Sequence, residues 1–171
     1  IVIINNYMID EYNYKKLYVS INNSYKEIEL GNTRYKNTDL NLSIIEIKKN
    51  DNDIFNYIEI DDKVYNNSFE IDYYKESIYI LQSNAINDIS VSYGVLNDIN
   101  DYQLSYSGKI KINYNGSLIF NLLNQKLIGV HEKSSKCYNK GIIIKYIINE
   151  FIEKYKNNIN CNNEIKIIII V

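Results

Sequence analysis

Proline and tryptophan are absent from this 171-residue sequence, histidine occurs once, and there are only two cysteines. The cysteines, Cys137 and Cys161, are too few and too irregularly spaced for a disulfide framework or for the four ligands of a structural zinc site. No glycine-rich phosphate loop, EF-hand loop or metalloprotease helix is present in the sequence. We therefore expect no metal and no cofactor, and we expect the reduced thiols of a cytoplasmic protein.

An excess of basic residues is also missing, because the net charge is −2 and the sequence pI is about 5.5. Nucleic acid and membrane surfaces are therefore poor partners, since proteins that bind phosphates or anionic lipid usually carry a basic patch. No apolar run approaches the ~20 residues that a membrane-spanning helix needs. The chain opens on Ile1 without a signal-peptide pattern. We expect a part of a longer protein, whose partner is a peptide, a protein or the rest of its own chain.

Short segments rich in β-branched and aromatic residues dominate the sequence, and clusters of Asn, Asp, Gly and Ser separate them. This pattern predicts an all-β fold, either a sandwich or a barrel. Eighteen tyrosines suit such a fold, because a ring can line a barrel wall while its hydroxyl reaches water. Solvated loops are expected for the charged pairs at 48–53 and 61–63. The expected strands are 15–21, 25–30, 42–47, 77–82, 90–95, 109–114 and 118–122.

One segment near the end of the chain has a helical period. Its apolar residues follow the i, i+3, i+4, i+7 spacing of an amphipathic helix and predict a single helix over 144–156. A polar run and a strand-like end follow, so that residues 157–171 are expected to be a linker and the start of a following segment. The residues on the apolar face are Ile144, Ile147, Ile148, Phe151, Ile152 and Tyr155.

The motif that precedes this helix is fairly specific. Residues 115–121 read Asn-Gly-Ser-Leu-Ile-Phe-Asn, residues 126–131 read Lys-Leu-Ile-Gly-Val-His, and Gly141 follows before an aliphatic strand. These segments resemble the C-terminal barrel of trypsin-like serine peptidases, particularly the glutamyl-endopeptidase-like branch. That branch carries Gly-x-Ser-Gly-Ser-Pro, an apolar strand, a hairpin and Ile-Gly-Ile-His in the same order.

Three upstream segments resemble the same family in the same order. Residues 90–96 look like the strand that opens the second barrel, residues 42–47 like the strand that carries the catalytic Asp, and residues 3–9 like the segment that carries the catalytic His. The resemblance covers residues 1–155 and implies two antiparallel β-barrels followed by a C-terminal helix. It divides the domain into an N-terminal barrel over 1–84, truncated because its first strands lie outside this chain, and a C-terminal barrel over 85–143.

Under this resemblance the catalytic triad is degenerate, since Tyr7 stands at the His position, Asn41 at the Asp position and Asn115 at the Ser position. The triad needs an imidazole to take the hydroxyl proton and a carboxylate to orient that imidazole. Tyrosine has a pKa near 10, asparagine does not ionise, and an Asn amide is no nucleophile for this chemistry. We expect these three residues to meet in the active-site groove and to cut nothing.

A residual site remains a candidate around Asn113, Gly116, Ser117 and His131. Asn113 replaces the first glycine of the turn that forms the oxyanion hole, whereas Gly116 is retained. Gly116 and Gly129 are equally consistent with a close passage of strands. His131 matches the family histidine that lines the primary specificity pocket, and it is also consistent with an ordinary half-buried polar residue at the end of a strand.

Three functions remain open. The first is a catalytically inactive serine protease homologue, a pseudoprotease that serves as a peptide- or protein-binding module. The second is an active endopeptidase whose site has moved to Ser117 and His131, which the expected hairpin places opposite each other, with Asp39 as a displaced carboxylate. The third is a structural β-rich segment of a larger intracellular protein.

Overall fold

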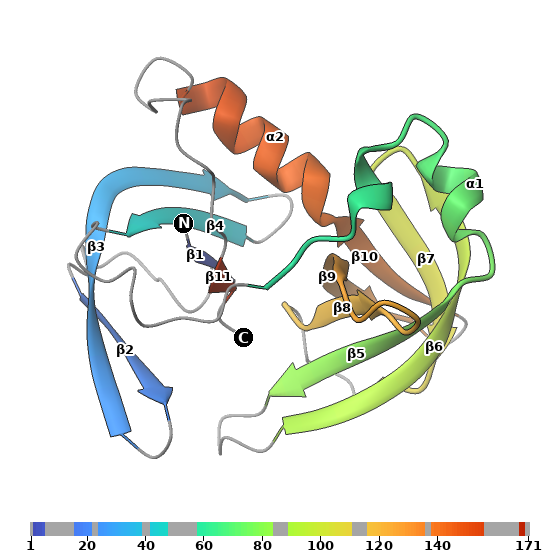
Figure 1. Cartoon of the computed structure of the whole chain (residues 1–171), viewed down its shortest axis with the longest axis horizontal. Helices are drawn as coiled ribbons and strands as arrows, with labels where there is room; N and C mark the ends of the chain where they lie inside the picture. The colour runs from blue at the N-terminus through green and yellow to red at the C-terminus, as the bar shows by residue number, and fades with distance from the viewer. Residues whose placement is uncertain are drawn as a thin grey trace. The chain divides into compact units, whose positions relative to one another are not determined.

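The computed structural model describes residues 2–5, 16–21, 24–38, 42–47, 58–83, 89–110, 116–135, 138–155 and 168–169. The chain forms two compact units (Figure 1). The first unit consists of Ile1–Ile58 together with Tyr155–Ile170, and the second extends over Glu59–Lys154. Each unit is built on one β-sheet, so the expected all-β fold is confirmed.

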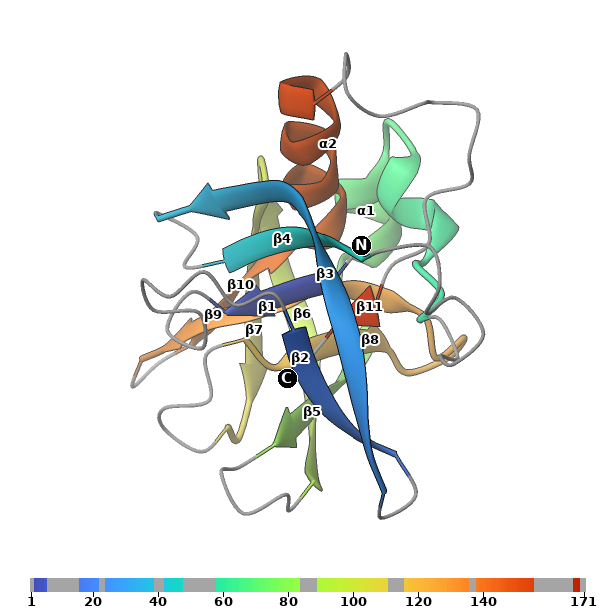
Figure 2. The same ribbon diagram turned by 90° about the vertical axis from the view of Figure 1, so that its left-hand side faces the viewer.

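The first unit is a five-stranded sheet in the order β11-β1-β4-β3-β2, which Figure 2 shows from the side of these strands. The pairs β1–β4, β3–β4 and β2–β3 are antiparallel, whereas β11 pairs with β1 in parallel. All four residues from Leu42 to Ile45 are buried, so β4 is covered on both faces. The strands are β1 (Val2–Asn5), β2 (Lys16–Ile21), β3 (Ser24–Asn37), β4 (Leu42–Ile47) and β11 (Ile168–Ile169).

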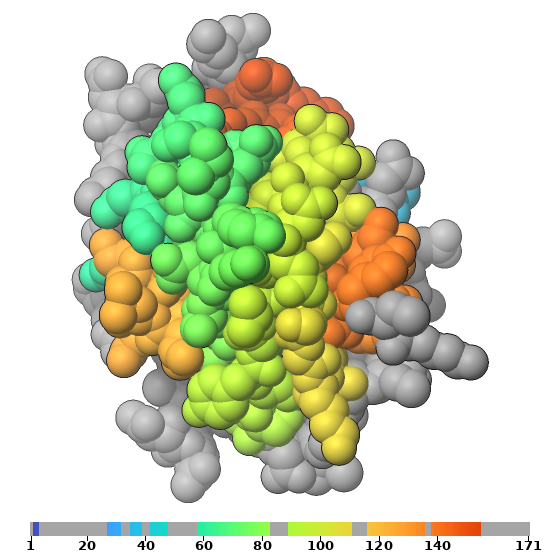
Figure 3. Space-filling model, turned by 90° about the vertical axis from the view of Figure 1, so that its right-hand side faces the viewer, coloured from blue at the N-terminus to red at the C-terminus, as the bar shows by residue number. Residues whose placement is uncertain are grey.

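The second unit is a closed six-stranded barrel in the order β10-β7-β6-β5-β8-β9, with every neighbouring pair antiparallel. Closure leaves no exposed edge in this sheet. Figure 3 shows β5 and β6 as adjacent bands on the surface of this unit, with α1 beside them. The strands are β5 (Ser77–Ser83), β6 (Ile89–Asn100), β7 (Gln103–Gly108), β8 (Leu118–Asn121), β9 (Leu127–Ser134) and β10 (Asn139–Ile143).

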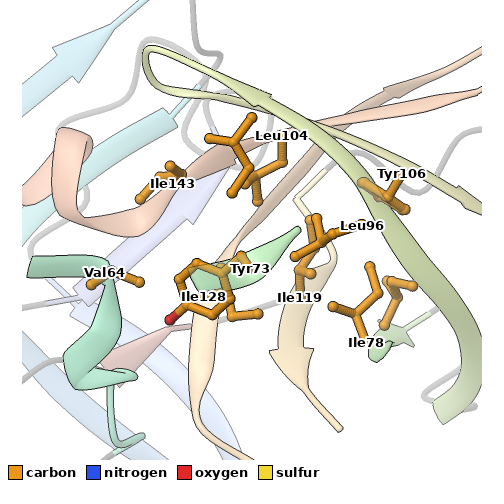
Figure 4. Close-up of a cluster of buried hydrophobic side chains, with 11 residues drawn as sticks. Val64, Tyr73, Ile78, Leu96, Leu104, Tyr106, Ile119, Ile128 and Ile143 are labelled. Atoms are coloured by element: carbon orange, nitrogen blue, oxygen red, sulfur yellow. The ribbon is translucent and has the colours of Figure 1, made fainter. Parts of the chain in front are cut away.

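The barrel is filled by a cluster of aliphatic side chains to which two tyrosines contribute (Figure 4). Ile78, Ile80 and Leu96 are fully buried because alternate residues of a strand point to the same side of the sheet. Val64 and Tyr73 come from the segment that precedes β5 and complete the cluster. At Gly129 the neighbouring strand passes so closely that a Cβ atom would lie 2.3 Å from the carbonyl oxygen of Ile142. Only glycine fits there. The structure therefore supports the interpretation that Gly129 allows two strands to pass closely.

Helix α2 (Ile144–Tyr155) follows β10 without a break and confirms the predicted helix. Ile144, Ile147, Ile148 and Phe151 are buried, as the amphipathic spacing predicts. The opposite side of the helix carries Tyr146, whose ring stacks on Tyr102 with the ring centroids 4.5 Å apart. This stack ties the first turns of α2 to the β6–β7 turn.

The division between the units differs from the expected one at residue 84. Strand β5 pairs with both β6 and β8, so it belongs to the closed barrel, and the second unit begins near Glu59. The end of the chain also differs from the expected linker over 157–171, because Ile168 and Ile169 pair with Val2 and Ile3 in the sheet of the first unit. Among the described residues the sheet of the first unit does not close into a barrel.

Local structure before β5 is richer than the sequence pattern indicated. A 3-10 turn, η3 (Asp62–Tyr65), overlaps the loop expected at 61–63, and a short helix, α1 (Phe69–Tyr73), follows it. Helix α1 was not predicted, because the sequence pattern indicates a single helix, at 144–156. Both η3 and α1 are too short to show an amphipathic period. Asp61 was expected in a solvated loop but is 2% exposed. Its carboxylate caps η3 by accepting a hydrogen bond from the Lys63 amide at 3.2 Å, and it accepts another from the Asn124 side chain at 3.0 Å.

Candidate functional site

The residues of the expected triad, Tyr7, Asn41 and Asn115, lie outside the described residues, and so do Asn113 and Asp39. Their expected convergence stays a prediction. The other residues of the candidate site, Gly116, Ser117 and His131, lie in the second unit, where β8 and β9 form one hairpin.

The hairpin register places Ser117 opposite His131. Leu118 pairs with Val130, and one residue further the His131 amide donates a hydrogen bond to the Ser117 carbonyl at 2.7 Å. This is the arrangement obtained by counting outward from a turn at Asn124. Both residues are sealed from solvent, with 1% of Ser117 and 2% of His131 exposed. A substrate carbonyl cannot reach a serine in this position unless the strands separate.

Gly116 extends the same ladder. Its amide donates to the carbonyl of His131 at 2.8 Å, so this N–H group is engaged in the sheet and does not point toward a bound oxyanion. Its φ of 92° lies in the region that favours glycine. Gly116 therefore serves the turn into β8, and any oxyanion donors would have to come from other residues.

The His131 ring is held at both nitrogens. The Tyr106 hydroxyl lies 2.6 Å from Nδ1, and the Ser134 hydroxyl lies 3.2 Å from Nε2. A neutral imidazole offers one donor and one acceptor, and a hydroxyl can serve as either, so each contact can be satisfied in one tautomer. The two rings also meet edge to face, with centroids 6.1 Å apart.

Tyr106 and His131 meet across a strand that lies between them. In the barrel β10 separates β7 from β9, and Gly141 of β10 pairs with Leu104 on one side and with His131 on the other. A Cβ atom at Gly141 would lie 3.5 Å from the Tyr106 ring and 2.6 Å from the side chain of Ile119. The missing side chain at Gly141 thus leaves the space in which the hydroxyl and the imidazole approach each other.

Burial decides the charge state of this pair. Removal from water lowers the pKa of His131 to about 4, while a hydrogen bond with the Lys140 backbone acts in the opposite direction. Burial likewise raises the pKa of Tyr106 well above its usual value. Both side chains are therefore neutral near pH 7. An imidazole with so low a pKa is a weak general base.

A second buried polar group, centred on Gln82, lies on β5 of the same barrel. Gln82 is 1% exposed, and its Oε1 atom accepts hydrogen bonds from the hydroxyls of Ser90 and Ser92 on β6, each at 3.3 Å. Its Nε2 atom has no hydrogen-bond partner among the described residues. The group holds no nucleophile with a neighbouring base, so it adds polar anchoring between β5 and β6 rather than chemistry.

Tyr106 and Ser134, the two partners of His131, were not among the candidate residues predicted from the sequence. A signal for Tyr106 was present, because Leu104 and Tyr106 alternate with polar residues in the manner of a half-buried strand. Nothing in the sequence indicated that Tyr106 would face a residue two strands away. Within the described ranges no group of three or more His, Cys, Asp or Glu side chains could hold a metal ion. None of the described helices is long and apolar enough to cross a membrane.

Comparison with known proteins places the fold. No family model matches the sequence, and no curated protein matches it. Many solved structures are similar, among them the apo form of the MamO protease domain from Magnetospirillum magneticum, with a TM-score of 0.58 and 8% sequence identity. The similarity covers 86% of this chain and 80% of that one. Together with the closed barrel, the second sheet and the C-terminal helix, it shows a trypsin-like fold.

Proposed function

We propose that this chain, whose fold is that of the trypsin-like peptidases, is a catalytically inactive homologue that serves as a peptide- or protein-binding module. The observation that carries the proposal concerns the imidazole. The sequence contains a single histidine, and that histidine is buried inside the barrel with both ring nitrogens engaged by Tyr106 and Ser134. A serine peptidase of this mechanism needs an imidazole that reaches both the nucleophile and the leaving group. No second imidazole exists in the chain to take that role.

The sequence positions support the same proposal. Tyr7, Asn41 and Asn115 stand where the resemblance puts His, Asp and Ser. Each substitution alone removes an essential group, and triad residues act as a unit, so restoring one would regain little. A trypsin-like scaffold without these groups retains surfaces that can bind peptides or proteins, which is the role we assign to it.

One observation favours the second function, an endopeptidase with its site at Ser117 and His131. The two residues are cross-strand neighbours, and such pairs have Cβ atoms about 5 Å apart. Three features argue against catalysis there: both residues are buried, the ring nitrogens of His131 already have hydroxyl partners, and the pKa of His131 is about 4.

Hydrolysis of a peptide pool tests the proposal. Because the resemblance is to the glutamyl-endopeptidase-like branch, a pool rich in Glu and Asp is the most sensitive substrate. The pool is analysed by mass spectrometry after incubation with the folded chain. We expect no new peptide ends above those obtained with the Ser117→Ala variant, which serves as the matched control. Cleavage by the unaltered chain that disappears in Ser117→Ala would establish the relocated site instead.

A further inference from the structure

The parallel pairing of the chain end with β1 is the only pairing in the described part of the first unit that is not antiparallel. Val2 pairs with Ile168 and Ile3 with Ile169. Figure 2 shows β11 as a short arrow beside β1. The sheet order is β11-β1-β4-β3-β2, so without β11 the strand at this end of the sheet would be β1.

Strand β1, which lies between β11 and β4, is buried. Val2 is 1% and Ile3 is 0% exposed, and since successive side chains of a strand point to opposite faces, both faces of β1 are covered here. An edge strand normally protects its unpaired N–H and C=O groups with charges, a proline or a bulge. The sequence of β1, Val-Ile-Ile-Asn, has none of these devices.

From these observations we propose that the edge of β1 that faces away from β4 is an acceptor site for an extended aliphatic peptide strand, and that the chain's own residues Ile168–Ile169 occupy it as an internal competitor. The mode is strand addition, in which backbone hydrogen bonds give affinity and alternate side chains give selectivity. The segment seated on the edge defines the chemistry of the partner. It lies in the run Ile167–Val171, which is aliphatic and uncharged throughout. The inference rests on the sheet of the first unit alone and stands whether or not the chain hydrolyses peptides.

Two features make the occupant displaceable. Among the described residues the pairing is two residues long, and a pairing of this length supplies few hydrogen bonds. The tail is tethered by the twelve residues 156–167 after α2, which can span about 40 Å when extended. A segment of the same chain competes at an effective concentration that for short linkers lies in the millimolar range, so a partner at micromolar concentration binds only when its own affinity is high or when the tail is removed.

The experiment uses a fluorescent peptide with the sequence of residues 164–171, Glu-Ile-Lys-Ile-Ile-Ile-Ile-Val, and two proteins. One is the full chain, and the other is the full-length variant Ile168→Pro/Ile169→Pro, whose tail has lost two amide donors and cannot continue a parallel ladder. We expect the variant to bind the peptide at least tenfold more tightly than the full chain, as measured by fluorescence anisotropy. The matched control peptide carries proline at the same two positions and should bind neither protein.

Hydrogen exchange shows whether the substitutions have disturbed the fold of the variant as well as the pairing of β11 with β1. The ring signal of His131 reports whether the barrel of the second unit is folded, and the amides of Ile44 and Ile45 report on β4 of the first unit. If β1 and β4 exchange rapidly in the variant, the peptide should restore their protection. Unchanged protection of the β1 amides in the variant, or a folded variant that gains no affinity for the peptide, or lost protection that the peptide does not restore, would each overturn the proposal.

Discussion

The hydroxyl of Tyr106 lies 2.6 Å from Nδ1 of His131, although the two residues stand on strands that are not neighbours in the barrel. They meet because Gly141, on the strand between them, has no side chain to fill the space. The imidazole of the only histidine lies buried in the barrel, where its contact with Tyr106 links β9 to β7. Burial of the ring in this position lowers the pKa of His131, so the imidazole is neutral near pH 7.

The first prediction concerns pH. The pKa of His131 is about 4 in the folded chain, against about 6.5 for an unperturbed histidine. The unfolded chain therefore binds more protons between these values, and the stabilising effect of the neutral ring, complete above pH 6.5, is lost as the pH falls from 6.5 to 4. The loss should amount to about 3 kcal/mol of the free energy of unfolding of the barrel.

A nuclear magnetic resonance titration of the ring protons measures this pKa without assignment ambiguity, because there is one histidine. Urea unfolding at pH 7 and pH 4.5, followed through the same signal, measures the loss of stability. His131→Gln cannot titrate and should show a flatter dependence over this interval. A ring that titrates near 6.5 in the folded chain would contradict the buried position of His131.

The second prediction concerns the hydroxyl of Tyr106. Tyr106→Phe leaves Nδ1 of His131 buried without its partner, and an unsatisfied buried polar atom costs about 1–3 kcal/mol. The free energy of unfolding of the barrel should fall by that amount in chemical denaturation. Tyr93→Phe is the matched control, because Tyr93 stands on β6 of the same barrel and is 65% exposed. Equal effects of the two substitutions would mean that the Tyr106–His131 contact contributes nothing.

The third prediction separates two neighbouring carboxylates. Asp61→Ala removes the cap of η3 and the acceptor for the Asn124 side chain, so the free energy of unfolding should fall by about 1–3 kcal/mol. Asp62→Ala removes a carboxylate that is 92% exposed and should leave stability nearly unchanged. Thermal unfolding of both variants in parallel measures the difference. A larger effect at Asp62 would reverse the assignment of the buried cap.

Much of the fold could be predicted from the sequence, because alternation and helical spacing are local properties. The strands at 42–47 and 118–122 and the helix at 144–156 follow directly from such patterns, and the structure has them within two residues of the expected ends. Strand β7 was missed because its outward positions are serines, Ser105 and Ser107, which have weak β propensity. The strand expected over 109–114 begins with Lys109 and Ile110, which are not in a strand in the structure. Its remaining residues lie outside the described residues.

The tertiary relationships could not be predicted in the same way. Pairing of β5 with β8 brings together segments about forty residues apart, and no local pattern indicates which barrel a strand joins. The same holds for β11, which joins β1 from the other end of the sequence. At the candidate site the register of Ser117 and His131 followed from counting along one hairpin, whereas the partners of His131 depend on the closure of the barrel.

The most direct test of the central claim is stoichiometric labelling of the folded chain with a fluorophosphonate probe, read by intact-protein mass spectrometry. The probe reacts with serines that an adjacent base activates, and in this chain the one imidazole is buried and engaged by Tyr106 and Ser134. We predict that the chain remains unlabelled under conditions in which an active serine peptidase reacts completely. Labelling at Ser117 that is abolished by His131→Gln would contradict the pseudoprotease account.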